Sequence, residues 1–127
     1  MILMFGPTGA GKSMQGQMLA ARVGWKWLST GEMLRSSENP EIIETLRSGE
    51  LVSDDQTYQV FDGAVREAIE KKYPQIIVDG FPRTKEQAEW MAKYLEGVHD
   101  QIDLVVVLEV PEAEIHKRLE LRGRMED

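Results

Sequence analysis

Residues 6–13 read Gly-Pro-Thr-Gly-Ala-Gly-Lys-Ser, which fills every fixed position of the phosphate-binding loop pattern G-x-x-x-x-G-K-[ST]. This pattern binds phosphate when it joins a buried strand to a helix, and the neighbouring sequence fits both. An apolar run, residues 1–5, precedes it, and the residues that follow repeat apolar side chains at the spacing of one helix face: Met14, Met18, Leu19 and Val23. The segment therefore predicts a strand, a glycine-rich turn and a helix over residues 13–23.

The residue types in this loop indicate how it would bind a nucleotide. Glycines allow the backbone N–H groups to approach phosphate oxygens, and the helix N-terminus adds positive charge. Lys12 would reach the β- and γ-phosphates, and the Ser13 hydroxyl would bind Mg²⁺. We expect the nucleotide to contact the whole segment Gly9, Ala10, Gly11, Lys12, Ser13 and Met14.

The rest of the chain alternates between strand and helix patterns. Apolar runs predict strands at residues 25–28, 75–78 and 102–110, and the run 104–108 suits a strand covered on both faces. Helices are predicted between them from N-cap patterns: Asn39-Pro40, Ser53-x-x-Gln56 and Thr84-x-x-Gln87, with a last helix over 111–121. Such alternation predicts an α/β fold with a parallel sheet. Ligands bind such sheets at the carboxyl ends of the strands, where the loop, Thr30 and Asp79 fall.

Composition excludes several classes of function. The 127 residues fit one domain, and 22 acidic against 15 basic residues give a net charge of −7, which does not suit a nucleic-acid partner. The sequence has no cysteine, so disulfides and thiolate metal sites are excluded. The apolar run at residues 1–5 is too short for a membrane span and lacks the basic flank of a signal peptide. We expect a cytoplasmic protein.

Three further segments resemble a known family. They read STGEMLR at 29–35, GELV at 49–52 and DGFPRT at 79–84. With the loop upstream, and in this order, they make residues 2 to about 124 resemble adenylate kinase and its nucleoside monophosphate kinase relatives. The resemblance implies a P-loop NTPase-type sheet in the order 2-3-1-4. It also implies reversible phosphoryl transfer from MgATP to AMP, giving two ADP.

The resemblance also implies an acceptor site beneath residues 30–60. Arg35 and Arg83 would clamp the AMP phosphate, because guanidinium groups match phosphate oxygens. Gln87 would read the adenine edge, although it could serve only as the capping partner of Thr84. The matching positions are Thr30, Gly31, Arg35, Leu51, Val52, Gly80, Arg83 and Gln87.

Donor-side residues follow from the same resemblance. Arg118 would lie against the ATP adenine and Arg122 near the phosphates, although both also suit a solvated basic helix face. Asp79 resembles the family acid that holds Mg²⁺ through water; a strand-end cap is the alternative. Lys12, Arg83 and Arg122 are then the catalytic residues. Met14 stands where these enzymes have threonine, and we expect it to lower turnover.

Two other activities stay open. A UMP or CMP kinase is the first, although those enzymes show alanine at the Thr30 position and asparagine at the Thr84 position. The second is a nucleotide-binding fragment with little catalysis. Family members continue with a lid, two more arginines and a fifth strand, and this sequence ends where the lid begins. We therefore expect a piece of a longer protein, an exposed strand edge beside residues 102–110, and association of copies of a normally monomeric enzyme.

Overall fold

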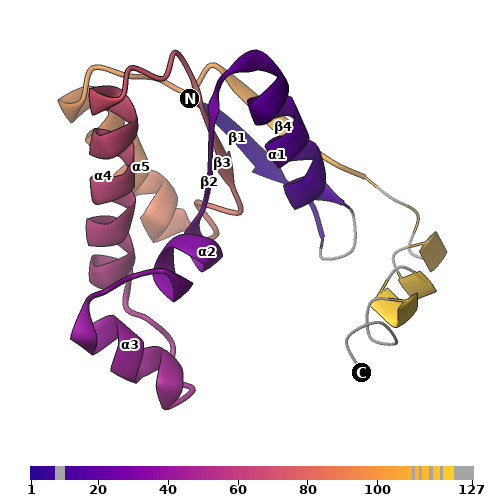
Figure 1. The fold of residues 1–127 in the computed structure, drawn as a ribbon, viewed down its shortest axis with the longest axis horizontal. Helices are drawn as coiled ribbons and strands as arrows, with labels where there is room; N and C mark the ends of the chain where they lie inside the picture. The colour runs from indigo at the N-terminus through magenta and orange to yellow at the C-terminus, as the bar shows by residue number, and fades with distance from the viewer. Residues whose placement is uncertain (8–10, 110, 112, 115, 118, 122–127) are drawn as a thin grey trace.

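The computed structural model describes residues 1–7, 11–109, 111, 113–114, 116–117 and 119–121. In this part of the chain, four strands form a parallel sheet in the order β2-β3-β1-β4 (Figure 1). The strands are β1 (Ile2–Phe5), β2 (Lys26–Ser29), β3 (Ile76–Asp79) and β4 (Leu104–Val107). The predicted fold class and strand order are confirmed.

The helices around this sheet are α1 (Lys12–Val23), α2 (Thr30–Arg35), α3 (Pro40–Arg47), α4 (Asp54–Glu70) and α5 (Lys85–Gly97). Helices α4 and α5 lie on one side of the sheet and α1 on the other, while α2 and α3 extend beyond the strand ends (Figure 1). Described residues between 113 and 121 are helical, where the last helix was predicted. None of the described helices is long and apolar enough to cross a bilayer.

The helix starts follow local sequence chemistry. The Asn39 side chain accepts a hydrogen bond from the N–H of Glu41 at 2.9 Å, and Ser53 and Gln56 form both bonds of the predicted capping box. Helix α2 was not predicted as a separate element. Its signal is present, because Ser29 accepts from the N–H of Glu32 three residues later.

The second predicted capping box forms only in part. Thr84 accepts from the N–H of Gln87 at 3.2 Å, as expected for an N-cap. The reciprocal bond is different, because Gln87 Oε1 accepts from the N–H of Arg83 at 2.7 Å instead of from Thr84. The carboxamide of Gln87 is therefore tied to the loop that carries Arg83.

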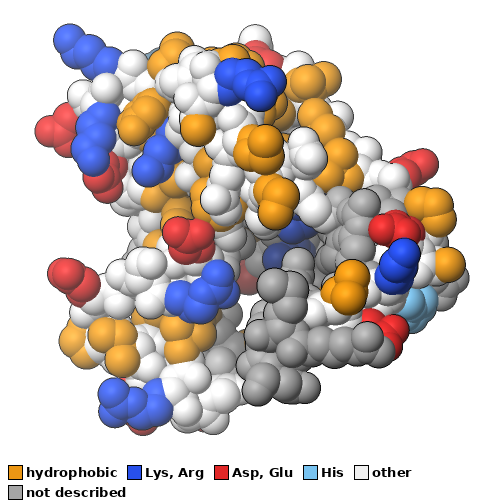
Figure 2. Space-filling model, turned by 45° about the vertical axis from the view of Figure 1, so that its right-hand side comes forward, with side chains coloured by type: hydrophobic (Ala, Val, Ile, Leu, Met, Phe, Trp, Pro, Cys, Tyr) orange, Lys and Arg blue, Asp and Glu red, His pale blue; other side chains and the backbone are white. Residues whose placement is uncertain are grey.

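The predicted apolar face of α1 is exposed among the described residues. Met14, Met18, Leu19 and Val23 are between 43% and 66% exposed, and hydrophobic side chains are visible over this part of the surface (Figure 2). The buried residues of the helix are Gly16 and Ala20. A Cβ on Gly16 would lie 3.0 Å from Trp27 Cδ1, so only a small residue lets α1 approach the sheet this closely. The face of α1 with small residues packs on the sheet, because a larger side chain at Gly16 would collide with Trp27.

Strand β4 agrees with the expected exposed edge beside residues 102–110, but not with the burial that its apolar run suggested. The apolar run at 104–108 was expected to be covered on both faces, yet Leu104, Val105 and Val107 are 50–58% exposed. The strand pairs with β1 and forms one edge of the sheet, so the described residues cover it incompletely. Most of the buried core lies on the face of the sheet opposite α1, where α4 and α5 pack Phe61, Val65 and Met91 against β1 and β3.

The Asp103 side chain, just before β4, bonds the first residue of the chain and Gln75, and the pH dependence of stability tests these bonds. The carboxylate accepts from the Met1 ammonium at 2.8 Å and from Gln75 at 2.9 Å, and these bonds hold its pKa at about 2, below the ordinary 3.8. A lowered pKa in the folded state stabilises the protein above pH 3.8, and this contribution is lost as the pH falls towards 2. We expect Asp103→Asn to lower the free energy of unfolding at pH 5, with the difference from the unmutated chain shrinking by pH 2.

Urea unfolding at a series of pH values measures this difference. Asp100→Asn is the matched control, since Asp100 lies farther from the same ammonium, at 3.6 Å, and should change the profile less. A difference that stays constant from pH 5 to pH 2 would contradict the assignment.

Candidate functional site

The carboxyl ends of β1, β2 and β3 meet at one edge of the sheet. Asp79, the last residue of β3, is in register with Met4 of β1 and with Ser29 of β2. The N–H of Gly80 donates to the carbonyl of Met4 at 3.1 Å. Because a parallel sheet aligns its strand ends, three loops with different residues converge here. The convergence is the one that the sequence predicted.

A buried carboxylate connects two residues of the phosphate-binding loop. Asp79 Oδ1 lies 2.7 Å from Lys12 Nζ, and Ser13 Oγ donates to Asp79 Oδ2 at 2.6 Å. The Asp79 side chain is 2% exposed and that of Lys12 is 18% exposed. Burial of an ionised carboxylate is tolerated when it is paired, and Lys12 supplies the countercharge. The structure thus assembles Lys12, Ser13 and Asp79 into one polar cluster.

Each of the two predicted acceptor arginines packs on a glycine. Arg83 Nε donates to the carbonyl of Gly80 at 2.7 Å, and a Cβ on Gly80 would lie 3.0 Å from Arg83 Nη2. A Cβ on Gly31 would lie 3.1 Å from Arg35 Nη1. Both arginines are solvent-exposed, so their guanidinium groups can accept a ligand. Basic side chains are visible in the hollow of the molecule in Figure 2.

Gly80 offers a direct test of this packing. It has a φ of +78°, a left-handed conformation that costs a residue with a Cβ about 1–2 kcal/mol. We expect Gly80→Ala to lower stability by about this amount and to displace Arg83, as measured by urea unfolding and by AMP titration. Gly63→Ala is the control, because nothing lies within 4 Å of a Cβ at this position in α4. That change should raise stability by up to about 1 kcal/mol; a loss at Gly63 equal to that at Gly80 would refute the explanation.

The remaining acceptor-side residues are more dispersed. Leu51 is 95% exposed and Val52 is half-buried, in the connection between α3 and α4. Thr30 is buried at the start of α2, and Gln87 lies in the first turn of α5. Gln87 Nε2 donates to Asp54 Oδ1 at 3.0 Å, a contact that sequence reasoning missed. Asp54 had no distinguishing signal, since acids commonly occupy the first turn of a helix.

Four predicted residues lie outside the described part of the chain. They are Gly9, Ala10, Arg118 and Arg122. The roles assigned to them stay predictions. Met14 is described, and its side chain is exposed at the start of α1.

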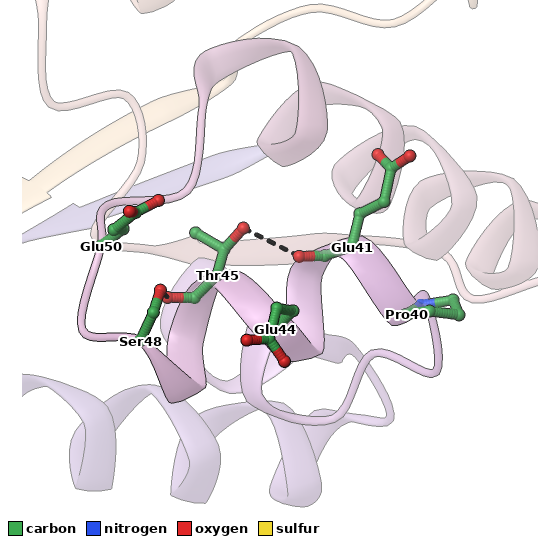
Figure 3. Close-up of a pocket in the computed structure, with 6 residues that line it drawn as sticks. All are labelled: Pro40, Glu41, Glu44, Thr45, Ser48 and Glu50. Atoms are coloured by element: carbon green, nitrogen blue, oxygen red, sulfur yellow. Dashed lines mark hydrogen bonds between the residues drawn. The ribbon is translucent and has the colours of Figure 1, made fainter.

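A separate hollow of about 530 Å³ lies over α3, away from the strand ends. It is lined by Pro40, Glu41, Glu44, Thr45, Ser48 and Glu50, and Figure 3 shows Glu41 and Glu44 pointing in different directions from the helix. Three carboxylates would repel nucleotide phosphates. The described residues contain no group of three or more His, Asp or Glu side chains arranged to hold a metal ion. The hollow therefore fits neither a phosphate nor a metal.

Comparison with known proteins shows which family the chain belongs to. The family model described as adenylate kinase matches residues 4–124. An adenylate kinase of Thermus thermophilus is 37% identical over 136 residues, which cover 99% of this chain and 69% of that protein. Adenylate kinases of Prochlorococcus marinus (strain MIT 9301) and Mycobacterium leprae (strain TN) are 34% and 35% identical, and this chain covers 70% and 72% of their lengths. The phosphate-binding loop, the paired Lys12 and Asp79 and the two glycine-backed arginines thus occur in a chain that belongs to the adenylate kinase family, a family of phosphotransferase enzymes.

Proposed function

We propose that this protein transfers the γ-phosphoryl group of ATP to AMP, giving two ADP. The observation that carries the proposal is the convergence of three loops at the carboxyl ends of neighbouring strands. One loop leads into Lys12, the second into the helix of Arg35 and the third into Arg83. Phosphoryl transfer depends mainly on alignment and charge neutralisation, which these cations supply. No general base is needed from the protein.

The two substrates divide between the loops. Lys12 exchanges Asp79 for the donor phosphates of ATP, and Arg35 and Arg83 clamp the phosphate of AMP. The nucleoside of AMP lies against Thr30, Gly31, Leu51, Val52, Gly80 and Gln87. Arg118 and Arg122 complete the donor side in this proposal, on the strength of the sequence resemblance alone.

Mg²⁺ fits the chemistry of the donor side. Ser13 offers a hydroxyl oxygen and Asp79 a carboxylate, 2.6 Å apart, and Mg²⁺ prefers such hard oxygen ligands. Ser13 would bind the ion directly, and Asp79 would hold it through water. The bound ion would neutralise phosphate charge, while the chain's own residues orient the substrates.

Gln87 favours AMP over UMP or CMP as the acceptor. Its carboxamide presents one donor and one acceptor, which can pair with the N1 and N6 edge of adenine. Thr30 and Thr84, found where the pyrimidine enzymes differ, agree with this choice. The proposal includes a cytoplasmic enzyme without nucleic-acid or membrane partners; the full-length family protein would be a monomer, and copies of the present chain would associate.

A coupled assay of ADP formation tests the function. We expect MgATP with AMP to form ADP, and MgATP with UMP or CMP to do so about 5- to 150-fold more slowly, as losing a matched hydrogen bond to a base costs about 1–3 kcal/mol. Equal rates with AMP and CMP would contradict the selection by Gln87, and faster rates with UMP or CMP would favour a pyrimidine monophosphate kinase. Calorimetric binding of AMP without any ADP formation would support the alternative of a nucleotide-binding protein with little catalysis.

A further inference from the structure

The hydrogen bonds of Gln87 use half of what its carboxamide can form. A carboxamide has two N–H donors and two acceptor lone pairs. One lone pair of Oε1 accepts from the N–H of Arg83 at 2.7 Å, and one Nε2 hydrogen goes to Asp54 Oδ1 at 3.0 Å. Among the described residues, no partner takes the second donor or the second acceptor of this carboxamide. This is the pair that the N1 and N6 edge of a 6-aminopurine requires.

Both neighbours of Gln87 force the same orientation of the amide. A backbone N–H can only donate, so it selects the oxygen of Gln87; a carboxylate can only accept, so it selects the nitrogen. Rotating the amide by 180° would set Oε1 against the Asp54 carboxylate and the NH₂ group against the Arg83 N–H. A donor would then face a donor and an acceptor would face an acceptor, and both repulsive contacts would oppose the rotation.

The position of Asp54 is itself supported by the fold. Asp54 begins α4, immediately after the capping residue Ser53, where a negative charge suits the helix N-terminus. Farther along, the same two helices are joined by the stack of Tyr58 on Trp90, at 4.0 Å between ring centroids. A third contact joins Asp62 to the Tyr94 hydroxyl at 2.7 Å. Two further contacts along the α4–α5 interface therefore hold Asp54 in place opposite Gln87.

We propose that Asp54 is a positioning residue that fixes the orientation of the Gln87 carboxamide and so makes the acceptor site select 6-aminopurine over 6-oxopurine nucleotides. The inference rests on the proposed function, because it assigns Gln87 to the acceptor base. A 6-oxopurine presents an N1–H donor and an O6 acceptor, the reverse order, and only a rotated amide could pair with both. Asp54 disfavours that rotated state.

Calorimetric titration with AMP and with inosine monophosphate tests this role. We expect the unmutated chain to bind AMP more tightly, and Asp54→Asn to reduce that preference by about tenfold, since a hydrogen bond to a charged group is worth about this factor. Asparagine can donate or accept, so it accommodates either orientation of Gln87 and retains a residue suited to the helix start. Asp54→Ala should have the same direction of effect. Asp55→Asn is the matched control, one residue farther along α4.

Several results separate this role from a structural one. If Asp54→Asn weakened the binding of AMP and of inosine monophosphate equally, the proposal would be overturned. An unchanged preference for AMP over inosine monophosphate would overturn it as well. In a Gln87→Ala background, Asp54→Asn should no longer alter the preference, because there is no amide to orient; a persisting effect would also overturn it. Failure of the unmutated chain to bind AMP at all would instead overturn the proposed function, and with it the role of Asp54.

Discussion

Replacing Arg83 by alanine is expected to weaken AMP binding by at least tenfold while ATP binding stays nearly unchanged. Arg83 lies after β3, held by the carbonyl of Gly80, and has no contact with the Lys12 cluster among those recorded for the described residues. Removing one partner of a desolvated charge pair costs about 2–5 kcal/mol, and the AMP phosphate would lose such a partner. The side chain is exposed, so the fold itself should lose little. Isothermal titration with each nucleotide measures both affinities.

Lys85→Ala is the matched control for Arg83. Lys85 is two residues away, is exposed and begins α5, so its removal changes the net charge equally without touching the clamp. Its effect on AMP affinity should be small, and smaller still at high salt. If the two variants weakened AMP binding equally, the effect would be one of general charge, and the clamp assignment would fail.

Replacing Lys12 by alanine is expected to abolish measurable ATP binding and also to destabilise the fold. The sequence suggests that a loop lysine can be removed with little structural cost, but the structure shows its ammonium 2.7 Å from a buried carboxylate. Removing one partner of a buried ion pair costs about 3 kcal/mol or more, since the other charge stays buried. The lower end applies here, because Ser13 still donates to Asp79. Urea unfolding and ATP titration measure the two effects.

A double variant separates the two roles of Lys12. Lys12→Ala combined with Asp79→Asn leaves no uncompensated charge, so most of the lost stability should return while ATP binding stays absent. Lys93→Ala, an exposed lysine of α5, should change neither quantity. Recovery of ATP binding in the double variant, or full stability in Lys12→Ala alone, would contradict the role assigned to the ion pair.

Much of the fold was predictable because its signals are local in the chain. The caps at Asn39 and Ser53 and the short apolar runs each depend on neighbours a few residues away. Alternating strands and helices predict parallel pairing, and the resemblance supplied the strand order, which the structure confirms. Helix α2 was missed although Ser29 and Glu32 marked its start.

The errors concern which side of an element is covered. Apolar spacing placed Met14, Met18, Leu19 and Val23 on one face of α1, but the sheet lies against Gly16 and Ala20. The choice depends on how closely the helix approaches Trp27, a distance that no spacing along the chain contains. The apolar run at 104–108 suggested a strand covered on both faces, whereas the expected strand order and the expected exposed edge beside residues 102–110 agree with the position of β4 at the edge of the sheet.

The sequence by itself determined the residue types of the site: a lysine and a hydroxyl after β1, arginines after β2 and β3, and a carboxylate at the end of β3. Only the tertiary structure decided their partners. Lys12 and Asp79 are far apart in the chain yet form an ion pair, and Asp54 meets Gln87 across two helices. Such contacts arise from the parallel alignment of strand ends and from the packing of α4 on α5. The sequence shows which hydrogen bonds and ion pairs each side chain is able to form, whereas the packing of the sheet and helices decides which of them it forms.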